Sequence, residues 1–363
     1  MLNSLRATFQ ALSPRVFPYR GFALALLAGT LGGWLFAAGN LPLPWMLGSM
    51  TACTLGALAR APIVAPGIVR PPMSMVIGVM LGAGFSPDLF GHLASWIPTI
   101  LGLAVFMIAC AFACVTYFRR FGGLDPTTAY FSGMPGGLIE MVMLGEQRGG
   151  DGRTIALLHS ARILLLVLTL PFLVQWLAGV NLGPSSRTGV SMLDAPWSTE
   201  LWLVATAIAG AALGSLLRLR AAFLIGPMIV TAAVHLLGWT SFTPPREIVN
   251  LAQLVLGTTI GCSFVGTRPA DILRVLVLSL GSTAILLSLT LLFAFGISLM
   301  SPYGVIPLLL AYSPGGLAEM SLIAVALQAE AAFVAGHHVI RIFFVMSGAN
   351  LAFRFLEPPD AQT

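Results

Sequence analysis

The residues best suited to chemistry in this chain occur twice, in the same order and with the same spacing. Each set has a Pro-Gly-Gly motif, then a glutamate, then a histidine three residues before an arginine. The two sets are Pro135, Gly136, Gly137, Glu140, His159 and Arg162, and Pro314, Gly315, Gly316, Glu319, His338 and Arg341. From 135 to 314 the displacement is 179 residues, and it is the same for every member. The chain therefore contains an internal duplication that preserves polar residues inside apolar sequence.

The two Pro-Gly-Gly motifs predict a break in the backbone followed by a short helix over 138–144 and 317–327. Irregular backbone within a membrane is tolerated only where protein or a watery cavity satisfies its N–H and C=O groups. A helix that begins at such a break directs free N–H groups and the positive end of its dipole into the cavity. The expected chemistry is the binding of a carboxylate or another anion.

Glu140 and Glu319 lie one turn into these predicted helices. An ionisable acid at membrane depth is costly, so it usually has a partner or a function. One interpretation is a carboxylate that couples transport to protons or sodium. The other is that each glutamate pairs with Arg162 or Arg341 and ties the motif to the next helix.

Each histidine shares a helix face with the arginine three residues later. Arg162 and Arg341 can bind an anionic substrate with two parallel hydrogen bonds, or serve as structural counter-ions. A neutral imidazole at His159 and His338 can hydrogen-bond between helices.

The composition predicts an all-α integral membrane protein. Hydrophobic residues make up 57% of the chain and charged residues only 9%, with a mean hydropathy of +0.93. A soluble domain carries about 25% charged residues. Apolar runs long enough to span a bilayer as helices cover 21–39, 42–59, 72–90, 93–117 and 153–180, then 197–218, 221–238, 246–265, 271–297 and 331–356. The glycine pairs 78/82 and 257/261 predict close helix packing.

The arginines choose between two topologies, because all 18 basic residues of the chain are arginine. With a cytoplasmic N-terminus, a model in which every stretch crosses puts ten arginines inside and six outside. If each Pro-Gly-Gly stretch instead enters and leaves on the same side, fourteen lie inside and two outside. The second model agrees better with the positive-inside rule. The first stays open if another run in each half fails to cross.

Five crossings in each half are an odd number, so the second half must be inverted relative to the first. We therefore expect two inverted membrane repeats, residues 1–180 and 181–363, each with five transmembrane helices and one re-entrant or broken Pro-Gly-Gly hairpin. Inverted repeats are typical of secondary transporters. The expected location is a bacterial cytoplasmic (inner) membrane, with several passes and a cytoplasmic N-terminus.

The duplicated segments SGMPGGLIEMVMLG and AYSPGGLAEMSLIAVAL, with HSAR and HVIR downstream, resemble the AbrB-type duplicated membrane protein family of bacteria. The resemblance covers nearly the whole chain, from about Gly21 to Phe355. Members of that family carry labels that include ammonia monooxygenase, regulator of gene expression and transporter. The family is also distantly similar to inverted-repeat secondary carriers. The resemblance assigns no catalytic residues.

We expect a secondary transporter that moves a small anionic solute by alternating access, coupled to protons or sodium, with the twelve residues of the two sets binding substrate or ion. The alternative is a membrane sensor or an indirect regulator of gene expression. A membrane monooxygenase is disfavoured because the five histidines are scattered, so we predict no enzyme, no metal and no cofactor. The expected partners are a small molecule or ion and the lipid bilayer. Nucleic acid is not expected, and a homodimer is compatible with the sequence.

Overall fold

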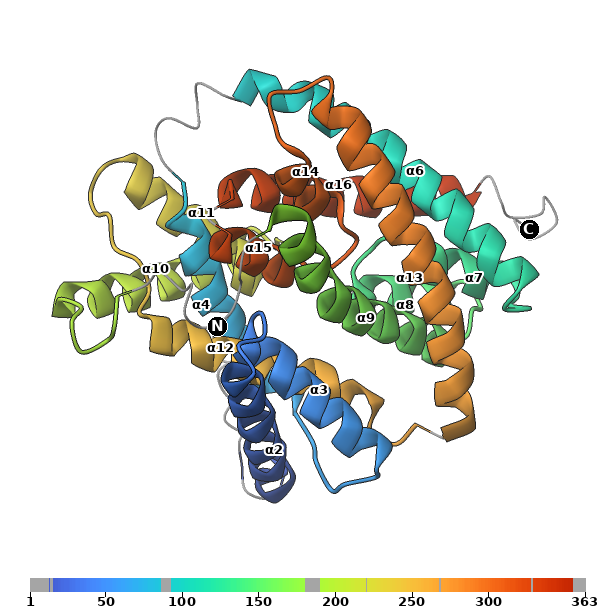
Figure 1. The fold of residues 1–363 in the computed structure, drawn as a ribbon, viewed down its shortest axis with the longest axis horizontal. Helices are drawn as coiled ribbons and strands as arrows, with labels where there is room; N and C mark the ends of the chain where they lie inside the picture. Colours follow the sequence, from blue (N-terminus) through green and yellow to red (C-terminus); the bar gives the residue numbers. More distant parts are fainter. Residues whose placement is uncertain are drawn as a thin grey trace. The chain divides into compact units, whose positions relative to one another are not determined.

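The computed structural model describes residues 13, 16–85, 93–179, 190–219, 221–267, 269–327 and 329–354, and within these ranges it contains helices and no strands (Figure 1). The first half contains α2 (Tyr19–Ala38), α3 (Pro44–Leu58), α4 (Arg70–Gly82), α6 (Trp96–Arg120), α7 (Pro126–Gly133), α8 (Leu138–Gln147) and α9 (Gly152–Ala178). The second half contains α10 (Trp197–Leu216), α11 (Ala222–Leu236), α12 (Arg246–Gly261), α13 (Pro269–Ser298), α14 (Val305–Tyr312), α15 (Leu317–Ala326) and α16 (Ala331–Arg354). The expected all-α fold is confirmed.

The helices themselves repeat along the chain. Helix α8 begins at Leu138 and α15 at Leu317, which is the 179-residue displacement of the sequence motifs. The seven helices of the second half follow those of the first in the same order; α14, α15 and α16 begin at the displaced positions, whereas α10 to α13 begin one to six residues earlier. The duplication therefore governs the elements as well as the site residues.

Every one of the ten predicted spans contains a helix, but their lengths differ. Within the described residues, six helices are long and apolar enough to cross a membrane, namely α2, α6, α9, α10, α12 with the turn that follows it, and α13. They indicate a multi-pass membrane protein. Helices α3 and α11 have 15 residues each and α4 has 13. The chain takes a left-handed conformation at Leu43 and Ala221, so α3 and α11 begin directly after these residues. The end of the run 72–90 lies outside the described residues.

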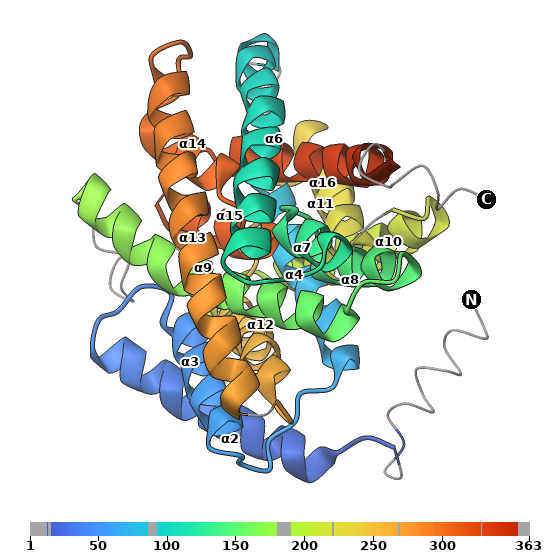
Figure 2. The same ribbon diagram turned by 90° about the vertical axis from the view of Figure 1, so that its right-hand side faces the viewer.

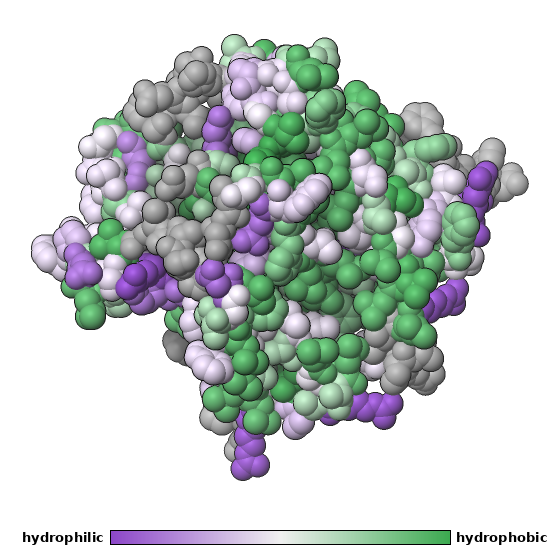
Figure 3. Space-filling model, viewed as in Figure 1, coloured by the Kyte–Doolittle hydropathy of each residue, from purple (hydrophilic) through white to green (hydrophobic). Residues whose placement is uncertain are grey.

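Exposed apolar side chains follow one face of the long helices. On α6 they recur at helical spacing, every three or four residues, at Ile97, Leu101, Val105, Ile108 and Phe112. The opposite face of the same helix is buried. Hydrophobic side chains also dominate the surface over α13 in Figure 3. Continuous apolar surface of this kind on a helix is expected where lipid is the solvent.

The chain divides into two compact units, and each takes segments from both halves. One unit comprises residues 1–87 and 170–269, and the other comprises 88–169 and 270–363. The compact units therefore do not follow the division at residue 180 that the sequence repeats define.

In the first unit, glycines bring helices of different halves into close contact. A Cβ on Gly78 of α4 would lie against Leu224 and Pro227 of α11. A Cβ on Gly257 of α12 would meet Met46 and Ser49 of α3 in the equivalent way. The expected close packing at the glycine pairs is confirmed. The next glycine of each pair contacts the next turn of the same partner, so α4 runs parallel to α11, and α3 to α12.

In the second unit, the equivalent helices α6 and α13 run antiparallel. Ser95, just before α6, shares a 2.8 Å hydrogen bond with Tyr303, just after α13. Arg274, near the start of α13, donates a 2.8 Å hydrogen bond to the carbonyl of Gly122, just after α6. Both views show the two helices passing in opposite directions (Figures 1 and 2). The site residues predicted from the sequence all belong to this unit.

Candidate functional site

The first Pro-Gly-Gly motif forms the tip of a helical hairpin. The Asp125 side chain accepts a hydrogen bond from Thr128 N at 2.9 Å and caps the start of α7, as aspartate commonly does. Helix α7 ends at Gly133 because Met134 precedes a proline and takes an extended conformation, with φ −65° and ψ 134°. The chain resumes as helix at Leu138, with Gly137 extended before it.

Helix α8 then returns toward the start of α7. Asp151 N donates to Thr128 Oγ1 at 2.9 Å, and a Cβ on Gly150 would lie 3.2 Å from Thr127. The segment thus enters and leaves at the same end of the unit. In the second copy, Tyr303 before α14 stacks on Phe333 of α16, with ring centroids 4.2 Å apart, so that hairpin returns in the same manner.

His159 and Arg162 of α9 satisfy the carbonyls that the first break exposes. The Nε2–H of His159 donates to Phe131 O at 2.8 Å. Arg162 donates to Met134 O at 3.1 Å and to Gly136 O at 3.3 Å. It also donates to Nδ1 of His159 at 2.9 Å, which fixes the tautomer of a neutral imidazole. A cation at this position also suits the negative end of the α7 dipole.

The second copy reproduces these contacts with one difference. His338 Nε2–H donates to Leu310 O at 2.9 Å, and Arg341 donates to Ser313 O at 2.5 Å and to Gly315 O at 2.6 Å. Here, however, Nδ1 of His338 has no hydrogen-bond partner in the described part of the chain. The structure therefore gives both histidines the role of hydrogen-bonding between helices.

Each glutamate folds back over the second glycine of its own motif. The Glu140 carboxylate occupies the place where a Cβ on Gly137 would lie, and the Glu319 carboxylate does the same at Gly316. The absence of a side chain at these glycines therefore leaves the space that the carboxylate occupies. Glu319 is 4% exposed, whereas Glu140 is half-buried.

The expected pairing of each glutamate with an arginine is absent among the described residues. Neither carboxylate lies within 4.0 Å of a guanidinium nitrogen of Arg162 or Arg341, whereas Arg246 and Glu247 do form an ion pair within this limit, at 2.9 Å. The arginines are instead held by backbone carbonyls, and they are 4% and 7% exposed. Among the described residues of the unit, the two buried cations thus have no carboxylate within 4.0 Å, and Glu319 interacts with Arg341 only from beyond that distance.

The two half-sites are neighbours within the unit. A Cβ on Gly136 would lie 2.8 Å from Val345, one turn beyond Arg341 on α16. Arg162 and Arg341 are close enough to interact electrostatically with each other and with Cys110 on the buried face of α6, and Arg341 also interacts in this way with Glu319. The duplicated residues are therefore brought together around one region, although 179 residues separate them in sequence.

Several buried polar atoms around this region were not predicted from the sequence. Ser132, Ser313 and Ser321 are at most 2% exposed, and their hydroxyl groups have no hydrogen-bond partner among the described residues. Nε of Arg162 and the hydroxyls of Ser279 and Thr283 are in the same state. A signal was present, because these are isolated polar residues within apolar runs. Within the described residues, no three His, Cys, Asp or Glu side chains are grouped as metal ligands.

Comparison with known proteins identifies relatives over most of the chain. A family model described as "Transition state regulatory protein AbrB" matches residues 45–357. The chain is 27% identical over 344 residues to "Uncharacterized protein YhjN" of Bacillus subtilis (strain 168), covering 87% of this chain and 88% of that protein. It is 23% identical over 321 residues to "Putative regulator AbrB" of Escherichia coli (strain K12), covering 88% and 92%.

Proposed function

The chain belongs to the AbrB family, and we propose that it is a secondary transporter that carries a small anion across the membrane by alternating access. The observation that carries this proposal is the pair of buried arginines, which have no carboxylate within 4.0 Å in the part of the chain that the structure describes. Buried cations are costly without a counter-charge. A small anion bound at this region supplies that charge, and Nε of Arg162, which has no partner in the described chain, offers a donor.

The arrangement of the helices supports alternating access. If consecutive membrane helices run in opposite directions, α3 runs opposite to α4. Because α3 packs parallel to α12, α12 also runs opposite to α4. Helices α4 and α12 are counterparts in the two halves, so this arrangement favours inverted halves. Helices α6 and α13 are also counterparts in the two halves, and their antiparallel packing supports the same conclusion. Two halves related by inversion can exchange conformations, which opens one site to each side in turn.

The glutamates fit the coupling function in this scheme. Glu319 is buried and lacks an arginine partner within 4.0 Å, so it can take up a proton or a sodium ion when the anion binds. The ion then offsets the charge of the carboxylate during the passage of the solute.

The first test is transport by purified protein in liposomes, measured as current on a solid-supported membrane after concentration jumps of small carboxylates, phosphate and sulfate. We expect current with at least one of these anions, or tracer flux without current where the coupling ion cancels the charge of the anion. Arg341→Lys keeps the charge but loses the fork that spans two carbonyls, so we expect about a tenfold or greater loss of current. Arg153→Lys, at an exposed position, is the control and should transport like the wild type.

A sensor or indirect regulator is the second candidate, and the name of the Escherichia coli relative favours it. The same experiment separates the two functions. If an anion raises the melting temperature of the protein but produces neither current nor tracer flux, the site serves sensing rather than transport. If a change in gene expression is seen only when the protein transports the anion, that change is instead a consequence of transport.

A further inference from the structure

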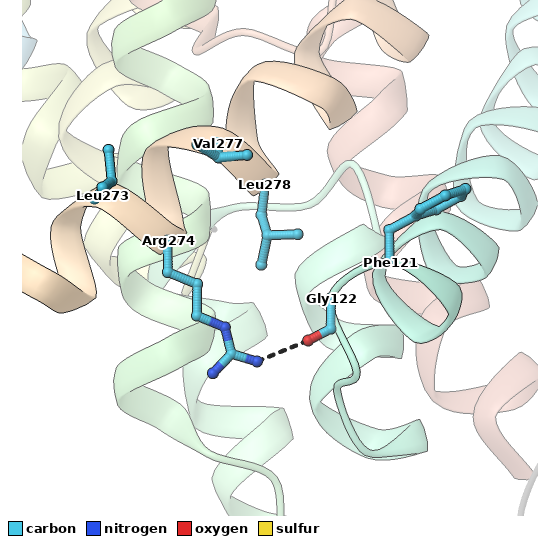
Figure 4. A pocket seen from close by; sticks show the side chains of 6 residues that line it. All are labelled: Phe121, Gly122, Leu273, Arg274, Val277 and Leu278. Atoms are coloured by element: carbon cyan, nitrogen blue, oxygen red, sulfur yellow. Dashed lines mark hydrogen bonds between the residues drawn. The ribbon is translucent and has the colours of Figure 1, made fainter.

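A second candidate site lies at one end of the α6 and α13 pair, within the same compact unit. It is a pocket of about 390 Å³ lined by residues that follow α6 and by the first turns of α13 (Figure 4). The lining residues are Phe121, Gly122, Leu273, Arg274, Val277 and Leu278. None of them belongs to the two duplicated sets of polar residues.

Arg274 is the charged residue of this lining. Its guanidinium donates a 2.8 Å hydrogen bond to Gly122 O, and the bond holds the side chain across the pocket (Figure 4). A guanidinium has five N–H donors in a rigid fork, and this bond uses one of them. Such a fork suits the oxygens of a phosphate group. The pocket therefore presents an oriented phosphate-binding side chain.

Three of the other lining residues are apolar and exposed, whereas Gly122 and Leu278 are buried. Phe121 is 75% exposed, Leu273 67% and Val277 59%. Leu280, one turn beyond Val277, continues the exposed apolar surface along α13. Arg119 and Arg120, both exposed, end α6 directly before Phe121 and add positive charge. A cation beside a strip of exposed apolar side chains matches the two chemical ends of a membrane lipid.

The opposite end of the same helix pair has a different chemistry. There Ser95 bonds to Tyr303, and Ser95 is the residue equivalent to Arg274 by the 179-residue displacement. The arginine count of the sequence places Arg119, Arg120 and Arg274 together on the cytoplasmic side. The guanidinium of Arg274 is therefore expected at the surface of one leaflet of the bilayer, the cytoplasmic one.

We infer that this pocket binds an anionic glycerophospholipid of the cytoplasmic leaflet, with its phosphate on Arg274 and an acyl chain along Leu273 and Val277. Basic pockets next to membrane helices bind anionic head groups, and Arg274 lines this pocket whereas the other described arginines do not. A free phosphate would gain nothing from the apolar strip, whereas a lipid uses both parts of the pocket.

The test is native mass spectrometry of the full-length protein in detergent, titrated with dioleoyl phosphatidylglycerol or with dioleoyl phosphatidylcholine. We expect tighter binding of phosphatidylglycerol. Arg274→Gln should weaken that binding by about fivefold, the effect of one basic residue near the surface. Arg274→Lys keeps the charge and should lose less. Arg218→Gln, at another exposed arginine assigned to the same side, should bind like the wild type.

Equal binding of the two lipids by the wild type would overturn the inference. So would phosphatidylglycerol binding by Arg274→Gln at the wild-type level. Displacement of phosphatidylglycerol by excess inorganic phosphate alone would assign the pocket to free phosphate instead. Wild-type elution of each variant in size-exclusion chromatography shows that the comparison is between folded proteins.

Discussion

At the scale of single residues, the two copies of the site share the contacts of their arginines but differ in the neighbouring side chains. Both arginines hold the carbonyls of their own break. The second copy has serine at 313 and 321, where the first has methionine at 134 and valine at 142. It also has the more deeply buried glutamate. The second copy is therefore the better candidate for binding the coupling ion.

The two glutamates should differ in a transport assay. Glu319→Gln keeps the shape of the side chain but removes a buried charge, so we expect the dependence of flux on a proton or sodium gradient to fall about tenfold or more. The half-buried Glu140 should tolerate the same change better. The measurement is tracer uptake by proteoliposomes under imposed gradients, with the anion found by the current assay. Equal losses in Glu140→Gln and Glu319→Gln would contradict the assignment of coupling to the second copy.

At the scale of elements, the hairpin tips explain why glycine recurs at 137 and 316. The space that a Cβ needs is filled by the carboxylate of Glu140 or Glu319. A side chain at either glycine must displace that carboxylate or move the start of the following helix. The tip and the glutamate are therefore one structural feature.

Gly316→Ala should test that feature. We expect the added methyl group to displace Glu319 at a cost of about 1–3 kcal/mol, as for overpacking of a core, and to lower transport. The control is Gly296→Ala on α13, where a Cβ would meet no atom within 4 Å. Thermal unfolding followed by fluorescence in detergent gives the stability of both variants. Wild-type stability and transport in Gly316→Ala would show that the carboxylate does not need this space.

Much of the element order could be predicted from the sequence. The break before Leu138 and Leu317 follows from proline and glycine chemistry, and the ten apolar runs each contain a helix. The partners of Arg162 could not be predicted, because its carbonyl acceptors lie up to 28 residues earlier and are placed by the hairpin. The buried serines were missed for a related reason. Burial without a hydrogen-bond partner depends on tertiary packing rather than on local sequence.

At the scale of the whole molecule, the duplication and the compact units are two different divisions of the chain. Each unit takes helices from both halves. In the first unit, equivalent contacts recur: Gly78 of α4 packs against α11, and Gly257 of α12 packs against α3. Local sequence patterns gave no indication of this exchange, because it depends on which helices pack together. It is the arrangement expected if both halves contribute equally to one moving site.

The most direct test of the proposed transporter is the side of the membrane on which three exposed positions lie. Single cysteines at Arg120, Gln147 and Leu299, in a background without the four native cysteines, are labelled in intact cells and in inverted vesicles with an impermeant maleimide. We predict that Arg120→Cys and Gln147→Cys react from the cytoplasm, because the hairpin between them returns to its side of entry. Leu299→Cys, at the position equivalent to Arg120, should react from outside. Labelling of Arg120→Cys and Leu299→Cys from the same side would contradict inverted halves and, with them, alternating access at this site.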